Sequence, residues 1–407
     1  MSLLLKNCRL IPELSGGWDQ GLADVLLEGQ MIAKILPAGD FGADSAEGKP
    51  AADTVIDCGG RTLMPGLIDL HVHLCTAGCG IGVEYVNEQD LIHKACRSAQ
   101  SYLAWGYTTI RDMGTTNAAS ATVRNMINEG ILKGPRILSS TRMLLPAGLL
   151  ERSDENTSYH SISGLEEMRR AVREEIGESR ADVVKIYASG SAYNPGGEPT
   201  LAILTPEEIR AAVEMADFRA RKVAAHCHSN TAIHYCIDAG VYTIEHASYI
   251  DEAGIAKMQG KDAYLVPTMT PYSYVKGSNP DPMMDAWFAQ IRQEMGEKIA
   301  PHMKAAYDAG LELGFGTDTA DGDFRTNGPG AEFRVRTEQC GMRTIDVLKQ
   351  ATQISAKIIG LEDRTGTLRE GFLADLILVD GKPEEDVSVF TRKPDLVIRN
   401  GEITCQH

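Results

Sequence analysis

The chain has 407 residues, of which 43% are hydrophobic and 24% charged, as is ordinary for a soluble globular protein with a sizeable core. Its 40 basic and 56 acidic residues give a formal net charge of −16, so a nucleic-acid backbone or an anionic membrane would be repelled on average. Residues Met1 to Pro12 lack the pattern of a secretory signal, and no apolar run approaches the roughly 20 residues that cross a bilayer. We therefore expect a cytoplasmic protein that binds neither nucleic acid nor membranes.

Short apolar stretches separated by turns occupy both ends of the chain, which is the pattern of small antiparallel strands. The predicted terminal strands are Ser2–Ile11, Val25–Leu27, Met31–Leu36, Thr54–Asp57, Ala374–Val379 and Leu396–Arg399. Because the pattern of the first sixty residues returns at the tail, we expect residues 1–60 and 367–407 to form one composite accessory domain of β-strands, similar to a β-sandwich.

Between the two ends, apolar strand-like runs alternate with longer helical patterns, which is the signature of a parallel sheet built from βα units. The eight predicted strands are Leu67–Leu74, Thr108–Met113, Ile137–Ser140, Val183–Tyr187, Val223–His226, Thr243–His246, Tyr264–Thr268 and Leu313–Thr317. Eight strands with helices between them fit a closed (β/α)8 TIM barrel over residues 61–366. One such α/β barrel with a modest accessory domain accounts for the length of the chain.

Two segments between these strands are typical of helices that wrap a barrel. Glu166–Ile176 and Pro206–Arg221 place apolar residues at three- and four-residue spacing among charges. Thr205 is a good helix cap, because it is followed by a proline that suits the first helical position. Four long loops follow predicted strands on their carboxyl side, where barrel enzymes build their active sites. They are Leu144–Ile162, Ser189–Ala202, Met269–Met284 and Ala320–Glu332.

His71 and His73 lie two residues apart at the end of the first predicted barrel strand, so both imidazoles point to one face and can bind one metal ion. An HxH pair alone is a weak signal, but ligand-type side chains also end four later strands. They are Lys185, His226, His228, His246 and Asp318. Each has an ordinary explanation on its own, as a snorkelling lysine, a satisfied core histidine or a helix cap. Together they predict a metal site, since independent structural accidents would not all fall at strand ends.

The cysteines suggest no second kind of metal site. Nine of them are scattered from Cys8 to Cys405, which is typical of reduced thiols rather than of a disulfide framework. Cys75 and Cys79 follow the histidine pair closely, but no second pair of cysteines completes a tetrahedral thiolate site.

The order of the strand-end side chains resembles the amidohydrolase superfamily, in its binuclear metal branch, over nearly the whole chain. The segment from Met64 to His73 (MPGLIDLHVH), the GTD word that ends at Asp318, and the tail segment from Gly371 to Leu376 (GFLADL) match the family pattern. The resemblance implies a barrel with a composite end domain and a centre of two divalent metal ions, usually zinc.

The resemblance also implies a role for each ligand. His71 and His73 would hold the more buried metal with Asp318, while His226 and His246 would hold the more exposed one. The bridging ligand would be Lys185 after carboxylation by carbon dioxide to N6-carboxylysine. A free ammonium group cannot bind a cation, whereas a carbamate can, and apolar neighbours favour the neutral amine from which it forms. Imidazole and carboxylate ligands also accept manganese, cobalt or iron.

Such a centre implies hydrolysis of an amide or peptide bond by a hydroxide shared between the metals, without a covalent intermediate. Asp318 would take the proton of the nucleophile and deliver it to the leaving nitrogen. His226 and His228 compete for the ligand position on the fifth strand, because their spacing of two lets both face inward. Family position favours His226 and leaves His228 free to bind the substrate or the tetrahedral oxyanion.

Within the superfamily, the paired His226 and His228 and the word Lys185-Ile-Tyr187 resemble imidazolonepropionase-related proteins and, more closely, zinc dipeptidases. The implied enzyme is a prolidase-type dipeptidase acting on Xaa-Pro. The free carboxylate of such a substrate needs a cation or a cluster of donors near the metals. The candidates for binding the substrate are Arg142, Arg325, Tyr187 and His228. For either arginine, a solvated surface position fits equally well.

Other functions use the same residues differently. A dipeptidase for other carboxy-terminal residues, or a hydrolase of cyclic amides or N-acyl amino acids, would keep the metals and change the pocket. A mononuclear deaminase would not need Lys185, and non-catalytic scaffolds on this fold typically lose ligands that this chain retains. The family resemblance implies a homo-oligomer that acts on a small molecule.

Overall fold

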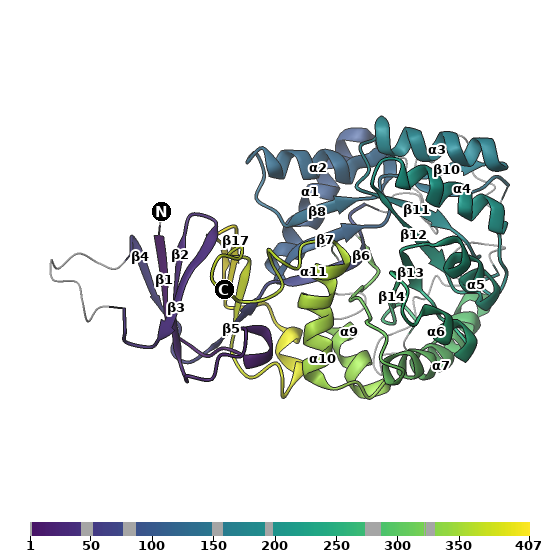
Figure 1. The fold of residues 1–407 in the computed structure, drawn as a ribbon. Helices are drawn as coiled ribbons and strands as arrows, with labels where there is room; N and C mark the ends of the chain where they lie inside the picture. Colours follow the sequence, from purple (N-terminus) through teal and green to yellow (C-terminus); the bar gives the residue numbers. More distant parts are fainter. Residues whose placement is uncertain are drawn as a thin grey trace.

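The computed structural model describes residues 2–41, 52–75, 87–148, 158–191, 198–272, 286–320, 322 and 330–407, with the backbone alone for residues 286–292. Two four-stranded sheets bring the ends of the chain together at one side of the molecule (Figure 1). The first sheet, in the order β3-β2-β1-β4, contains β1 (Ser2–Cys8), β2 (Ala23–Glu28), β3 (Met31–Pro37) and β4 (Thr54–Asp57). The second, in the order β18-β17-β16-β5, contains β5 (Thr62–Pro65), β16 (Leu376–Val379), β17 (Leu396–Arg399) and β18 (Glu402–Gln406).

One hydrophobic cluster draws side chains from both of these sheets. Leu5 and Val25 come from the first sheet, and Leu63 and Ile398 from the second. Alternate residues of β1, β2, β16 and β17 belong to this cluster, and burial of their apolar side chains explains why segments so far apart in the sequence pack together. The six predicted terminal strands correspond to β1 to β4, β16 and β17, with ends that differ by at most two residues except that β1 ends at Cys8 rather than at Ile11. The short strands β5 and β18 are additions.

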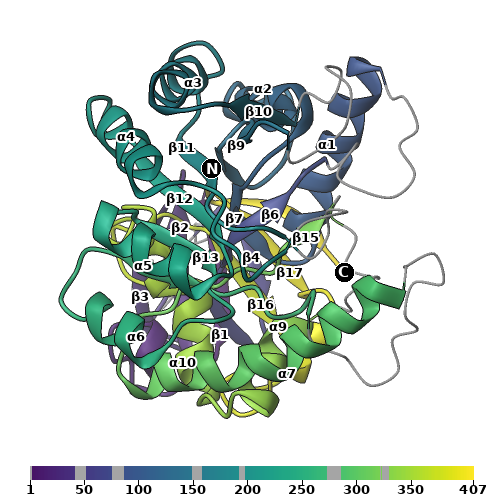
Figure 2. The same cartoon turned by 90° about the vertical axis from the view of Figure 1, so that its right-hand side faces the viewer.

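Parallel strands form the centre of the remaining part (Figures 1 and 2). One sheet, in the order β15-β6-β7-β8, contains β6 (Leu67–His73), β7 (Tyr107–Asp112), β8 (Arg136–Ser139) and β15 (Thr319–Ala320). The other, in the order β10-β9-β11-β12-β13-β14, contains β9 (Met143–Pro146), β10 (Tyr159–Ile162), β11 (Val183–Tyr187), β12 (Lys222–Cys227), β13 (Thr243–His246) and β14 (Tyr264–Val266). The first seven predicted barrel strands coincide with β6, β7, β8, β11, β12, β13 and β14 to within two residues.

The predicted eighth strand over Leu313–Thr317 does not form a regular strand. This segment forms only a single bridge to β14. The backbone N–H of Thr317 donates to the side chain of Asp69 on β6, at 3.1 Å, instead of to a backbone carbonyl group of that strand. Gly316 lies so close to His71 that an added Cβ would come within 2.9 Å of the histidine Cβ. The segment therefore passes between β14 and β6 as irregular backbone, and ladder pairing resumes at β15.

The predicted loop Leu144–Ile162 overlaps the two short strands β9 and β10. β9 follows β8 after a break at Thr141, whose φ is +61°, and it pairs in parallel with β11. A positive φ is rare for a β-branched residue, so nothing in the sequence marks the break. The third predicted strand thus continues beyond Thr141 into the second parallel sheet.

Helices surround the parallel strands (Figure 2). They are α1 (Glu88–Ala104), α2 (Ala119–Asn128), α3 (Leu165–Gly177), α4 (Pro206–Asp217), α5 (Asn230–Ala239), α6 (Glu252–Met258), α7 (Ala286–Asp308), α9 (Ala331–Arg334), α10 (Thr344–Lys349) and α11 (Ser355–Ile358). Both predicted helices are confirmed as α3 and α4, and Thr205 caps α4 through a capping box with Glu208. α4 ends at Asp217 rather than at Arg221, because the backbone turns to a φ of +50° at Ala220. Among the described helices, none combines the length and the apolar character that crossing a membrane requires.

Candidate metal centre

Four histidines from the ends of β6, β12 and β13 lie in one buried cluster. His246 is at its centre: the centroid of its ring lies 4.7 Å from that of His71, 4.5 Å from that of His226 and 4.7 Å from that of His228. The ligand atoms of His226, His228 and His246 all lie within 4.8 Å of one another, and so do those of His71, His246 and Asp318. Two adjacent groups of metal-ligand type therefore share His246.

His71 points one ring nitrogen into this cluster. Its Nδ1 lies 2.8 Å from Oε2 of Glu245, and its Nε2 lies 3.6 Å from Oδ1 of Asp318. A carboxylate without a proton can only accept, so Nδ1 carries the hydrogen and donates it to Glu245. The lone pair of Nε2 is then free to bind a metal ion, an arrangement common around metal-binding histidines.

His73 is oriented in the same way by a backbone group. Its Nδ1 donates to the carbonyl oxygen of Gly114, at 2.9 Å, and its Nε2 lies 3.4 Å from Oδ1 of Asp318. Burial alone would lower the pKa of His73, but the hydrogen bond and the negative charge of Asp318 outweigh burial and raise it. Asp318 thus faces the Nε2 atoms of both histidines of the HxH pair.

The backbone around Asp318 is held by two hydrogen-bonding anchors. Its own N–H donates to the carbonyl oxygen of His71 at 2.8 Å, and its φ of +54° turns the chain at this point. One residue earlier, the hydroxyl of Thr317 lies 2.6 Å from Oδ2 of Asp69. Burial raises the pKa of Asp69 to about 7, although the hydrogen bonds from Thr317 act in the opposite direction.

The other three histidines of the cluster also have hydrogen-bond partners. Nδ1 of His246 lies 2.7 Å from Oγ1 of Thr268, and Nε2 of His226 lies 3.2 Å from the carbonyl oxygen of Gly190. His228 contacts Ser248, whose Oγ lies 2.7 Å from Nδ1 of the histidine. The partners of His246 and His226 leave the opposite ring nitrogen of each histidine for the cluster, whereas Nε2 of His228 lies 3.3 Å from the hydroxyl of Tyr272.

Burial determines the charge state of these rings. It lowers the pKa of His71, His226 and His246 well below the usual value, and that of His228 to about 3. The rings are therefore neutral near pH 7. Neutral imidazole is the form that binds metal ions.

Lys185 lies on β11 and is buried with 1% of its surface exposed. Burial lowers the pKa of its amine to about 8, and nearby carboxylates such as Glu245 only partly oppose this effect. A substantial fraction of the amine is thus neutral at mildly alkaline pH. Neutral amine is the species that can react with carbon dioxide.

Comparison with known proteins decides the family. A model described as the amidohydrolase family matches residues 62–404. The chain belongs to the amidohydrolase family. Among curated proteins, ochratoxinase of Aspergillus niger is 32% identical over 360 residues, which cover 81% of this chain and 72% of that protein. Among solved structures, a prolidase in complex with N-methylphosphonate-L-proline is 27% identical with a TM-score of 0.86 over the full length of both chains. A Xaa-Pro dipeptidase with bound methionine is 28% identical with a TM-score of 0.84 and covers 99% of this chain and 100% of that chain.

The donor set of this amidohydrolase suits divalent metal ions. Imidazole nitrogens and a carboxylate are borderline ligands that zinc and its neighbours accept, and the nitrogens facing the cluster are those left over when the other nitrogens bind protein acceptors. The donors at the ends of β6, β12 and β13 lie in two adjacent groups that share His246.

The predicted substrate-binding residues have different surroundings. The ring of Tyr187 stacks on that of His226 with centroids 4.2 Å apart, so Tyr187 lies beside the cluster. Arg142 instead forms an ion pair with the buried Glu175 of α3, at 2.6 Å. Arg325 lies outside the described residues. Both arginines remain predictions as carboxylate-binding residues, and the described contacts do not bring Arg142 to the histidines.

Several residues that contact the histidines of this amidohydrolase were not predicted from its sequence. Glu245 receives hydrogen bonds from His71 and from the buried Arg111, whose Nη2 lies 2.8 Å from Oε1 of Glu245. Tyr272 places its hydroxyl 3.3 Å from Nε2 of His228. A charged residue inside a predicted barrel strand, as Arg111 and Glu245 both are, is the signal that could have identified this pair. No such signal marks Thr268 or Tyr272.

Proposed function

We propose that this amidohydrolase is a metal-dependent dipeptidase of the prolidase type, which hydrolyses the amide bond of Xaa-Pro dipeptides. The observation that supports it most directly is Asp318 facing Nε2 of both His71 and His73 beside a cluster of neutral histidines. Likeness over the full chain to structures of a prolidase and of a Xaa-Pro dipeptidase supports the choice of substrate class.

Two divalent ions, of which zinc is the first choice, would be held by protein ligands on both sides of His246. The proposed ligands are His71, His73, Asp318, His226, His246 and Lys185 as N6-carboxylysine. Such ions, when bound, supply a Lewis acid for the scissile carbonyl and lower the pKa of a coordinated water. The low pKa of the Lys185 amine supports its carboxylation.

Asp318 and His228 would move and donate protons during the reaction. Asp318 would accept a proton from the attacking water and deliver it to the leaving nitrogen. The hydroxyl oxygen of Tyr272 lies 3.3 Å from Nε2 of His228. Together these two groups would donate one hydrogen bond to the carbonyl oxygen as it becomes negative during the attack. Tyr187, stacked on His226, would line the substrate side of the cluster.

A second candidate is an amide hydrolase for substrates other than dipeptides. The 32% identity with a protein named ochratoxinase favours it. Hydrolysis of cyclic amides or N-acyl amino acids would use the same ligands and Asp318, with the pocket lined differently.

A matched substrate panel tests the proposal. The zinc- and bicarbonate-treated protein is assayed with Phe-Pro, Phe-Ala, Phe-Pro amide, N-acetyl-phenylalanine and a cyclic amide. We expect Phe-Pro to have the highest kcat/KM and its amide to lose at least about ten-fold, because the free carboxylate no longer finds its partners. A higher kcat/KM for N-acetyl-phenylalanine or the cyclic amide would replace the dipeptidase with the second candidate.

We also propose that the parallel strands close into a barrel over residues 61–366 and that residues 1–60 and 367–407 form the accessory domain. Closure is supported by hydrogen bonds at the two gaps between the sheets. Leu70 N donates to Phe315 O at 2.8 Å on one side, and Asp182 N donates to Ser139 O at 2.7 Å on the other.

A further inference from the structure

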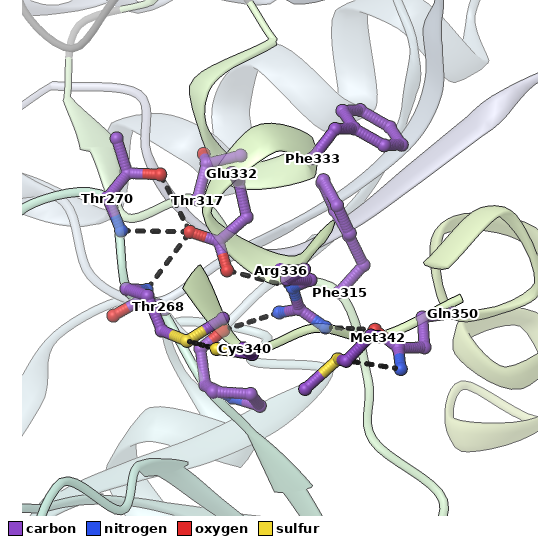
Figure 3. A network of polar contacts seen from close by, with 12 residues as sticks. Thr268, Thr270, Phe315, Thr317, Glu332, Phe333, Arg336, Cys340, Met342 and Gln350 are labelled. Carbon is purple, nitrogen blue, oxygen red and sulfur yellow. Dashed lines mark hydrogen bonds and ion pairs between the residues drawn. The ribbon is translucent and has the colours of Figure 1, made fainter. Parts of the chain in front are cut away.

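Arg336 is the largest fully buried side chain of the described residues, with none of its surface exposed. It lies in the π-helical stretch Val335–Gln339 that follows α9, outside the histidine cluster. Its Nε donates to Oε1 of Glu332 at 2.8 Å, and its Nη2 donates to the carbonyl oxygen of Pro267 at 2.7 Å. Its Nη1 donates to the carbonyl oxygen of Gly314 at 3.0 Å and to Oε1 of Gln350 at 2.6 Å. The planar guanidinium group thus joins four separate acceptors. Its bonds to Glu332 and Gln350 can be followed in Figure 3.

Glu332 completes the network with its second carboxylate oxygen. Oε2 accepts hydrogen bonds from the backbone N–H of Met269 at 3.0 Å, from that of Thr270 at 2.9 Å and from the hydroxyl of Thr270 at 2.7 Å (Figure 3). Both charges of the pair are therefore compensated although both side chains are buried.

The hydrogen bonds of Arg336 and Glu332 hold the backbone on both sides of Thr268. Arg336 binds the carbonyl group just before Thr268, and Glu332 binds the two N–H groups just after it. The hydroxyl of Thr268 in turn lies 2.7 Å from Nδ1 of His246, the histidine common to both ligand groups. The bond to Gly314 holds, in addition, the start of the segment that carries Asp318.

We propose that Arg336 and Glu332 form a positioning unit for the metal centre, which fixes Thr268 so that its hydroxyl accepts the Nδ1 proton of His246. The Nε2 lone pair of His246 then points into the cluster. The metal-binding part of this inference rests on the proposed function. The part that concerns the tautomer of His246 does not.

A double-mutant cycle measures whether Arg336 acts through Thr268. Zn²⁺ affinity is determined by competition with a chromophoric chelator for the wild type, Thr268→Val, Arg336→Lys and the double variant. Lysine keeps the positive charge beside Glu332 but lacks the planar fork that reaches Pro267 and Gly314 together. We expect each single variant to bind Zn²⁺ about ten-fold more weakly, and the double variant no weaker than about ten-fold, because both changes remove the same restraint.

Arg343→Lys is the matched control. Arg343 forms a bidentate ion pair with Asp346, and its side chain is 74% exposed. This variant should bind Zn²⁺ as the wild type does. The proposal that Arg336 acts through Thr268 would be overturned if Arg336→Lys bound Zn²⁺ as tightly as the wild type. It would also be overturned if the double variant bound Zn²⁺ about a hundred-fold more weakly, since the two losses would then be independent.

The tautomer of His246 is a second measurement that needs no metal. In the metal-free protein with ¹⁵N-labelled histidine, the ring-nitrogen shifts of His246 should report a proton on Nδ1 in the wild type and a mixture of tautomers in Arg336→Lys. Thr270→Val, which removes a single bond to Glu332, should give a smaller change in the same direction and serves if Arg336→Lys does not fold. Identical spectra in all variants would refute the positioning unit. Failure of the wild type to bind Zn²⁺ would instead refute the proposed function and leave the tautomer result to decide the positioning.

Discussion

Oε2 of Glu245 lies 2.8 Å from Nδ1 of His71, and neither side chain has more than 1% of its surface exposed. The other carboxylate oxygen of Glu245 receives the guanidinium group of Arg111 at 2.8 Å. A buried carboxylate without a partner would be very unfavourable, so the guanidinium group of Arg111 compensates the carboxylate of Glu245 beside His71.

Glu245→Gln should weaken metal binding and destabilise the fold at the same time. The amide removes the charge that orients the Nδ1 proton of His71, and it leaves Arg111 buried without its counter-charge. We expect Zn²⁺ affinity to fall about 10- to 100-fold and the free energy of unfolding by about 3–5 kcal/mol. Chelator competition and urea unfolding measure the two effects. Glu312→Gln, at an exposed ion pair with Lys357, should change neither.

Lys185→Ala should reduce the bound metal from two ions per chain toward one and abolish hydrolysis. Acetate or propionate should restore part of both, because a small carboxylate can occupy the place of the carbamate. Elemental analysis and an amidase assay follow the change. Lys222→Ala, at the exposed start of β12, is the control. One metal ion in the wild type and an active Lys185→Ala variant would rule out the bridging role.

The two histidines at the end of β12 should respond differently to alanine. His226→Ala should lose one metal ion, since His226 is the proposed ligand. His228→Ala should keep both ions and lose kcat by about 10²- to 10³-fold, because it removes a donor to the developing oxyanion. Metal content after gel filtration separates the two results, and loss of metal in His228→Ala alone would exchange the assignments. His234→Ala on α5 controls for loss of a histidine elsewhere.

Asp318→Asn should retain substrate binding and lose turnover. The amide can still lie beside Nε2 of His71 and His73 but cannot accept a proton from water, so kcat should fall by about 10²- to 10⁴-fold with a small change in KM. Steady-state kinetics at equal metal content test this. Near-normal kcat in the variant would exclude Asp318 as the proton carrier.

Asp69 predicts a pH dependence of stability for the metal-free protein. Burial raises its pKa to about 7, whereas an unfolded aspartate has a pKa near 3.8. Between these values the folded state binds more protons than the unfolded state, so this contribution to stability is complete below pH ~4 and is lost as the pH rises through about 7. The difference in unfolding free energy between wild type and Asp69→Asn should therefore fall by on the order of 3 kcal/mol from pH ~4.5 to ~7.5. A pH-independent difference would contradict the raised pKa.

The sequence predicts the strand ends well because regular patterns and ligand-type side chains coincide there. His71, His226 and His246 all fall within or at the end of predicted strands that exist as β6, β12 and β13. The irregular backbone at Thr141 and Asp318 could not be predicted from the sequence, for a physical reason. Thr141 and Asp318 adopt positive φ values that only their tertiary surroundings impose.

The supporting partners escape for another reason. Thr268 and Arg336 lie almost seventy residues apart, and only folding brings the guanidinium group of Arg336 to the carbonyl group next to Thr268. Periodicity describes which face of an element is buried, whereas a hydrogen bond between distant loops leaves no periodic trace. Ligand-type side chains can be found from a sequence pattern, whereas the residues that position them are found only in the structure.

Because β5 pairs with β16, the second terminal sheet can form only late in the synthesis of the chain. β5 leaves the ribosome early, but its antiparallel partner is made only after the parallel strands and their helices have emerged. Until then, Leu63 of β5 and Leu5 of β1 lack the apolar neighbours that β16 and β17 contribute to their cluster. A nascent chain that stops before β16 exposes this apolar surface to chaperones and proteases, so the terminal sheets are complete only after all the parallel strands have been synthesised.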